Sequence, residues 1–169
     1  MSDCCKGTAC EVREPKARRP ALARCPECGR KGKSVDHITL EHLLFDPLVQ
    51  TLGQDTYFFC ATPACGTVYY SGAVAARSFR KDDLKVRVGI KETEDPIPLC
   101  YCFGHTRGSV WAEIEKTGRS TALDSIRSEI QAGRCECEIK NPSGKCCLGD
   151  VTIAVWERQG VQVGAGFKG

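Results

Sequence analysis

The sequence has little of the material that builds a large apolar core, and it lacks segments that would direct the chain into a membrane. It contains a single methionine, and aromatic residues make up 7% of its 169 positions. The N-terminal residues include no apolar run like that of a secretory signal peptide. No stretch approaches the roughly 18 apolar residues that a membrane-spanning helix requires. We therefore expect a cytoplasmic protein without a membrane span.

An excess of one charge is also missing. Lysine and arginine total 24 against 21 aspartate and glutamate residues, which gives a net charge of +3. So weak an excess, without a basic stripe, argues against nucleic acid as a partner. The three histidines, His37, His42 and His105, accompany no recognisable nucleophile motif, so the sequence does not indicate an enzyme.

Cysteine, by contrast, is abundant, with 13 residues. The cytoplasm keeps thiols reduced, and clustered thiols there usually bind metal. A secreted domain held by disulfides is the alternative, and the odd number of cysteines argues against it. Cys4, Cys5 and Cys10 lie within residues 1–20, where no apolar pattern repeats. We expect a disordered tail there, whose thiols either are incidental or bind a soft metal.

Residues 21–94 carry the clearest metal-binding motif. Two cysteine pairs, each followed by glycine, are formed by Cys25 with Cys28 and by Cys60 with Cys65. A glycine in that place permits the tight turn in which backbone amides face the thiolate sulfurs. Four thiolates that leave no open position fit a structural, tetrahedral zinc ion. We therefore predict a zinc domain in which these four cysteines are the ligands. His37 and His42 should lie outside the coordination shell.

Local patterns predict how the zinc domain folds. Residues that favour strands flank the second pair, so Cys60 and Cys65 should lie near the tip of a hairpin. Leucines at helical spacing predict a short helix over 39–44, capped by its first residue, a threonine. Alternating apolar residues over 84–90 predict a strand, and a polar run places the end of the domain near Glu94.

Residues 95–150 contain the second group of cysteines. Cys100 and Cys102 precede two amphipathic segments, 109–118 and 121–133, that predict a helix-turn-helix. Such a pair returns the chain to its start, where it would meet the later cysteines of this region, Cys135, Cys137, Cys146 and Cys147. Over 151–169, alternating apolar residues and then glycines predict one strand and a loose tail.

The spacing of this second group leaves two metal centres open. Two irons bridged by two sulfides need four terminal thiolates, and a second zinc ion asks for the same residue type. With either centre, we expect the α+β class: a small zinc-knuckle or zinc-ribbon-like β part followed by a helix-turn-helix part.

A family resemblance favours the iron–sulfur centre. A Cys-x-Cys pair, a helix-turn-helix and a second cysteine group resemble the [2Fe–2S] fold of the bacterioferritin-associated ferredoxin family, whose second group is Cys-x-x-Cys. Nearly the whole chain is similar to the N-terminal domain of CopZ-type copper chaperones. The motifs that carry this similarity are Cys25–Gly29, the Cys60/Cys65 hairpin, Val86–Val88, Cys100–His105 and Asn141–Gly149.

The resemblance to CopZ-type chaperones implies one zinc ion and one [2Fe–2S] cluster, with Cys100 and Cys102 as one pair of cluster ligands. For the other two we select Cys137 and Cys147. Close alternatives are Cys135 and Cys146. Full chaperones of this type continue into a copper domain with a Met-x-Cys-x-x-Cys loop, which this sequence lacks. Copper delivery by this chain alone is therefore not expected.

The hypothesis for function is a metal-handling and electron-transfer module linked to copper trafficking. It would reduce Cu(II) to Cu(I), a cargo for a copper-binding chaperone domain or a copper-transporting ATPase, and the sequence does not identify its electron donor. The alternative is a two-zinc scaffold without redox activity that binds a partner protein or nucleic acid.

Overall fold

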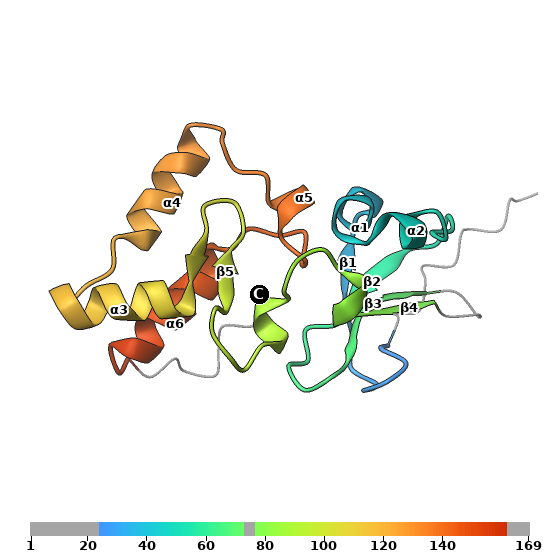
Figure 1. Ribbon diagram of the computed structural model, residues 1–169, viewed down its shortest axis with the longest axis horizontal. Helices are drawn as coiled ribbons and strands as arrows, with labels where there is room; N and C mark the ends of the chain where they lie inside the picture. The colour runs from blue at the N-terminus through green and yellow to red at the C-terminus, as the bar shows by residue number, and fades with distance from the viewer. Residues whose placement is uncertain (1–23, 73–76, 162–169) are drawn as a thin grey trace, which may run out of the picture.

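The computed structural model describes residues 24–72 and 77–161. The tail predicted over 1–20, with Cys4, Cys5 and Cys10, lies outside the described residues, as does the end of the region predicted over 151–169. The four-stranded sheet with two short helices forms one half of the molecule, and the longer helices lie in the other half (Figure 1), which confirms the predicted α+β class. Within the described residues, no helix has both the length and the apolar character to cross a membrane.

The first half is built on a four-stranded antiparallel sheet with the strand order β1-β2-β3-β4. Two short helices connect the first strand to the second. The register places Lys33 opposite Phe59 and Tyr57 opposite Ser71. The elements of this half are β1 (Lys33–Val35), α1 (His37–Leu43), α2 (Asp46–Val49), β2 (Tyr57–Phe59), β3 (Thr67–Ser71) and β4 (Ser78–Arg80).

Both faces of the two central strands are buried, because each face packs against a different structure. Tyr57 and Phe59 pack in a core with Leu40 of α1, whereas Phe58 and Tyr70 pack with cysteines on the opposite face. Side chains that alternate between the two faces of a strand explain this division. The predicted hairpin is confirmed, and its long connection carries both cysteines of the second pair.

The strand predicted over 84–90 is wrong. This segment instead follows one short 3-10 helix, η1 (Lys81–Asp83), and ends inside a second, η2 (Gly89–Lys91). Leu84 forms one isolated bridge to Leu44. Local backbone hydrogen bonds replace a ladder, and the alternating apolar residues do not share one buried face, since Ile90 is 46% exposed.

The second half contains the predicted helix pair and one further long helix (Figure 1). Gly118 and Gly133 follow the two paired helices with positive φ angles of 79° and 70°, as glycines that terminate helices often do. Buried side chains of α3, α4 and α6 form one core together with cysteines. The elements are β5 (Pro98–Cys100), β6 (His105–Thr106), α3 (Arg107–Thr117), α4 (Ala122–Gln131), α5 (Cys137–Lys140) and α6 (Leu148–Arg158).

The strand predicted after residue 150 is also wrong, because this segment belongs to α6. Val151, Ala154 and Val155 are buried, at the spacing of one helical face, whereas Ile153 is 38% exposed. The alternation of Val151, Ile153 and Val155 fitted a strand, but the burial of Ala154 next to Val155 fits only a helix.

The two halves meet through α5, which Figure 1 shows beside α1. Thr39, expected as a helix cap, lies inside α1 and donates a hydrogen bond to the Glu138 carbonyl at 2.6 Å. The hydroxyl of Tyr69 in β3 donates to the Pro142 carbonyl at 2.7 Å. The boundary predicted near Glu94 therefore separates two parts that are in direct contact.

Candidate metal centres

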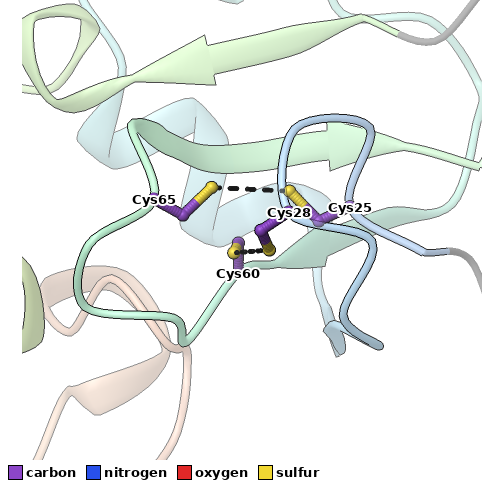
Figure 2. A group of neighbouring side chains, drawn as sticks. All are labelled: Cys25, Cys28, Cys60 and Cys65. Carbon is purple, nitrogen blue, oxygen red and sulfur yellow. Dashed lines mark hydrogen bonds between the residues drawn. The ribbon is translucent and has the colours of Figure 1, made fainter.

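Four thiols of the first half converge on one point (Figure 2). Cys25 and Cys28 come from the loop before β1, and Cys60 and Cys65 from the connection between β2 and β3. All four sulfurs lie within 4.8 Å of one another. The Cys25 and Cys65 sulfurs are 3.7 Å apart, as are those of Cys28 and Cys60. Tetrahedral zinc with Zn–S bonds of about 2.3 Å needs sulfurs about 3.8 Å apart, so the donor set and its spacing fit zinc.

The local sequence folds into this shape through short backbone turns. The Cys25 amide donates to the Arg30 carbonyl at 2.8 Å, and the Gly29 amide donates to the Cys25 carbonyl at 2.9 Å. Gly29 has a φ of 69°, a left-handed conformation that side chains other than glycine rarely adopt. The glycine after the second cysteine of this pair therefore does what the sequence pattern indicated.

Two charged residues that the sequence reasoning missed fix the second cysteine pair. Glu27 accepts hydrogen bonds from the Gly66 amide and the Thr67 hydroxyl, both at 2.9 Å, and the bond from Gly66 is the main reason that the pKa of Glu27 is lowered. Lys91 is only 6% exposed, and its ammonium donates to the carbonyls of Thr62 and Cys65. Of these two residues, only Glu27 could have been found from the sequence, because it lies between Cys25 and Cys28.

Burial and hydrogen bonding separate the thiol pKa values in this centre. A hydrogen bond with the Thr62 hydroxyl is the main cause that lowers the pKa of Cys28 to about 6. Desolvation raises the pKa of Cys65 to about 12 and also raises that of Cys60. Zinc binds thiolates, so it must displace the protons that the metal-free site retains.

A second thiol group lies where the helix pair returns the chain to its start. The sulfurs of Cys102, Cys135 and Cys137 lie within 4.8 Å of one another. The Cys137 sulfur is 3.7 Å from Cys102 and 3.3 Å from Cys135. Cys100 and Cys147 are buried in the same core but lie outside this group of three. The predicted helix pair thus brings together the cysteines that precede and follow it.

Cys147 joins the two sides of this group. Hydrogen bonding with the Cys147 side chain is the main cause that lowers the pKa of Cys100 to about 7 and that of Cys137 to about 5. The same bonds raise the pKa of Cys147 itself, the bond to Cys100 most. Burial raises the pKa of Cys102 to about 12. The group is therefore elongated: Cys100 and Cys147 are at one end, Cys102 is at the other, and Cys137 lies between.

Backbone amides also face these sulfurs. The Glu136 amide donates to the Cys102 sulfur at 3.4 Å. The amides of Phe103 and Cys147 donate to the sulfurs of Cys100 and Cys137. Amide hydrogen bonds to sulfur are a general feature of thiolate metal centres, where they stabilise the charged ligands.

Cys146 and the histidines occupy other positions. Cys146 is exposed and lines an open pocket, next to the buried Cys147. The ring of His37 is hydrogen bonded to the Asp55 carbonyl at 2.7 Å, and His105 pairs with Cys100 through the backbone of β5 and β6. In the part of the chain that the structure describes, neither potential metal-binding group of three or more residues includes a histidine.

The fold and the two thiol groups define an α+β metal-binding protein with cysteine as its ligand. Comparison with known proteins makes the assignment specific. Residues 22–85 match the family of CopZ zinc-binding domains, described as a zinc binding domain. The crystal structure of the CopZ N-terminal domain from Archaeoglobus fulgidus is similar, with a TM-score of 0.64, 34% identity, and coverage of 83% of this chain and 99% of that one. The chain belongs to this family of CopZ-type N-terminal domains.

The resemblance proposed from the sequence is therefore confirmed, and zinc binding with it. A curated relative, the copper chaperone CopZ of Archaeoglobus fulgidus, is 35% identical over 127 residues, which cover 75% of this chain. The match covers 58% of the relative's own length. The sequence reasoning had the family and its zinc part right, whereas the cluster and its ligands stay predictions.

Proposed function

We propose that this chain is a metal-handling and electron-transfer module that binds one structural zinc ion and one [2Fe–2S] cluster. In this proposal zinc is held by Cys25, Cys28, Cys60 and Cys65. The cluster ligands are Cys100, Cys102, Cys137 and Cys147.

The observation that carries the cluster is the difference in shape between the two thiol groups. The first is compact, and all four of its sulfurs lie within 4.8 Å of one another, as a single ion requires. The second is elongated, since Cys100 and Cys147 lie outside the group formed around Cys102. A centre with two irons needs two thiolates at each of two metal ions, so an elongated set of thiols supports it better than a single zinc ion.

The thiol contacts also indicate how the ligands divide between the irons. Cys100 is hydrogen bonded to Cys147, and the Cys102 sulfur lies 3.7 Å from that of Cys137. We assign one iron to Cys100 and Cys147 and the other to Cys102 and Cys137. Cys100 and Cys102 then bind different irons, although they are the one pair of ligands that precedes the helix pair.

The proposed activity is the conversion of copper to the form that thiol sites prefer. When bound, the cluster supplies one-electron chemistry, and a Cu2+ ion that gains one electron becomes Cu+. The curated relative is named a copper chaperone, which supports a role beside copper. We propose that Cu+ passes to a copper-binding chaperone domain or a copper-transporting ATPase in the cytoplasm, and that the chain is an accessory module and not an enzyme.

Metal analysis tests the proposal. The chain is purified anaerobically, and iron, zinc and acid-labile sulfide are measured per chain alongside the visible spectrum. About two irons, two sulfides and one zinc are expected, with the absorption bands of an iron–sulfur protein. Cu2+ is then added to the reduced protein, and Cu+ is detected with a chromophoric chelator. A colourless protein without sulfide would refute the cluster, and unchanged Cu2+ would refute the reductive role.

A two-zinc scaffold is the second candidate, and one observation favours it. Cys102, Cys135 and Cys137 form a group of three thiols with spacings close to those of a zinc site. A fourth ligand would complete a tetrahedral shell. Two zinc ions per chain and no sulfide would support this scaffold, which would bind a partner protein or nucleic acid without redox activity.

A further inference from the structure

Two described thiols are not among the eight proposed ligands, although the Cys135 sulfur lies within 4.8 Å of those of Cys102 and Cys137. The structure describes ten cysteines, and four zinc ligands and four cluster ligands leave Cys135 and Cys146. Both line one open pocket, and they come from opposite ends of the segment that contains α5. The pocket brings together two thiols that a simple count of ligands would discard.

Both thiols line the pocket, but their surroundings differ, since Cys135 also packs against the core of the second half. Cys147 is 1% exposed, whereas the preceding Cys146 is exposed. Cys135 is half-buried, and its sulfur is 3.3 Å from that of Cys137, which lines the same pocket. The pocket therefore opens to solvent on one side and reaches a proposed cluster ligand on the other.

We propose that Cys135 and Cys146 bind Cu+ as a pair of thiolates. Soft thiolate ligands select Cu+, and two of them suffice for this ion, which accepts low coordination numbers. Glu136 and Glu138 also line the pocket, as does Lys145, and Glu136 is paired with Lys140 at 2.6 Å, so the thiols and not the local charge carry the assignment to copper. The inference rests on the proposed function for its cluster ligands and adds the place where the copper ion binds.

The position of the pocket indicates the role of the proposed copper site. Cys137 is shared between the pocket wall and the proposed cluster ligands, so copper bound there lies one thiol away from the second centre. A site open to solvent can also release its ion to a partner with stronger thiol ligands. This is a different role from that of the zinc ligands, of which Cys25, Cys60 and Cys65 are buried.

The test compares Cu+ retention in five versions of the full chain loaded with zinc and cluster: the wild type, three variants and one control. Cu+ is supplied anaerobically with a chromophoric chelator that competes for it. The variants are Cys135→Ser, Cys146→Ser and the double variant. A matched control, Cys4→Ser with Cys5→Ser and Cys10→Ser, reports copper held by the first 20 residues. Iron, sulfide and zinc are measured in every sample.

The wild type is expected to retain about one Cu+ per chain that the double variant loses, with at least about tenfold weaker retention in each single variant. The triple control keeps this copper, and no variant loses iron. Equal copper retention in the wild type and the double variant overturns the inference, and so does its loss in the triple control. Loss of iron from the double variant would identify these cysteines as cluster ligands, which also overturns it.

This design separates the two proposals. If the wild type contains no iron or sulfide, the proposed function fails. The difference in Cu+ retention between the wild type and the double variant still decides whether Cys135 and Cys146 bind copper.

Discussion

Lys91 provides the sharpest test of how the zinc centre is held together. Its ammonium is buried beneath the second cysteine pair and donates to the carbonyls of Thr62 and Cys65 at 2.8 and 3.0 Å. Zinc with four thiolates carries a net negative charge, so a buried cation beside it is favourable. The variant Lys91→Met keeps most of the side-chain volume and removes both the charge and the donors.

The expected cost follows from the two lost hydrogen bonds. A hydrogen bond that involves a charged group contributes about 1.5–3 kcal/mol. Water can solvate the carbonyl of Thr62, which is half-buried, so the low end applies and the total is about 3 kcal/mol. When this loss of free energy falls on the zinc-bound state, the zinc affinity decreases about a hundredfold, since 1.4 kcal/mol is a factor of ten.

Zinc competition with a chromophoric chelator and denaturant unfolding both measure this effect. Lys85→Met is the matched control, because Lys85 pairs with Asp46 at 2.7 Å on the surface, where the two side chains are 38% and 84% exposed. Such a pair contributes about 0–1 kcal/mol. If Lys91→Met holds zinc as tightly as Lys85→Met and unfolds at the same denaturant concentration, the proposed role of the buried ammonium is refuted.

Other substitutions test the two centres and the packing between their parts. Cys102→Ser is expected to lose iron and keep zinc, whereas Cys28→Ser is expected to lose zinc and unfold the sheet. Metal analysis measures the first effect and circular dichroism the second. Equal iron loss in both variants would contradict two separate centres. Gly89→Ala places a Cβ 1.9 Å from the Pro98 carbonyl oxygen and should cost about 2 kcal/mol or more in denaturant unfolding. Gly149→Ala meets nothing within 4 Å in α6 and should stabilise by about 1 kcal/mol, so the reverse order would contradict the packing.

Local signals in the sequence were sufficient for the zinc centre. Paired cysteines with a following glycine carry their own turn geometry, as Gly29 shows with its φ of 69°. Strand-forming residues on both sides of Cys60 and Cys65 predicted the hairpin that the structure contains. The chemistry of this centre depends on residues close in sequence within each pair, so reading them needed no tertiary structure.

Apolar alternation was misleading where packing partners decide the local structure. Val151 and Val155 fit either a strand or a helix, and the buried Ala154 that marks the helical face carries too weak a signal alone. Leu84 and Val88 are buried in the sheet core, but 3-10 turns flank them, and among the described residues this segment forms a single bridge, from Leu84 to Leu44. The secondary structure of these two segments could not be predicted without knowing which parts of the chain pack against them.

Long-range contacts could not be predicted from any motif. Lys91 reaches the second cysteine pair from a turn far along the chain, and Thr39 reaches the Glu138 carbonyl across the two halves. The proposed division of roles between Cys135 and Cys137 likewise rests on tertiary placement: Cys137 contacts both Cys102 and Cys147 and is the more buried. Spacing alone had left these two cysteines as alternatives.

The central claim is that the elongated second thiol group holds a [2Fe–2S] cluster. The most direct test is the electron paramagnetic resonance spectrum of the chain, purified anaerobically and reduced by one electron. A reduced [2Fe–2S] cluster has one unpaired spin, so the account predicts a signal of about one spin per chain, which Cys102→Ser abolishes or shifts. A silent spectrum from a chain that contains two zinc ions and no sulfide would contradict it.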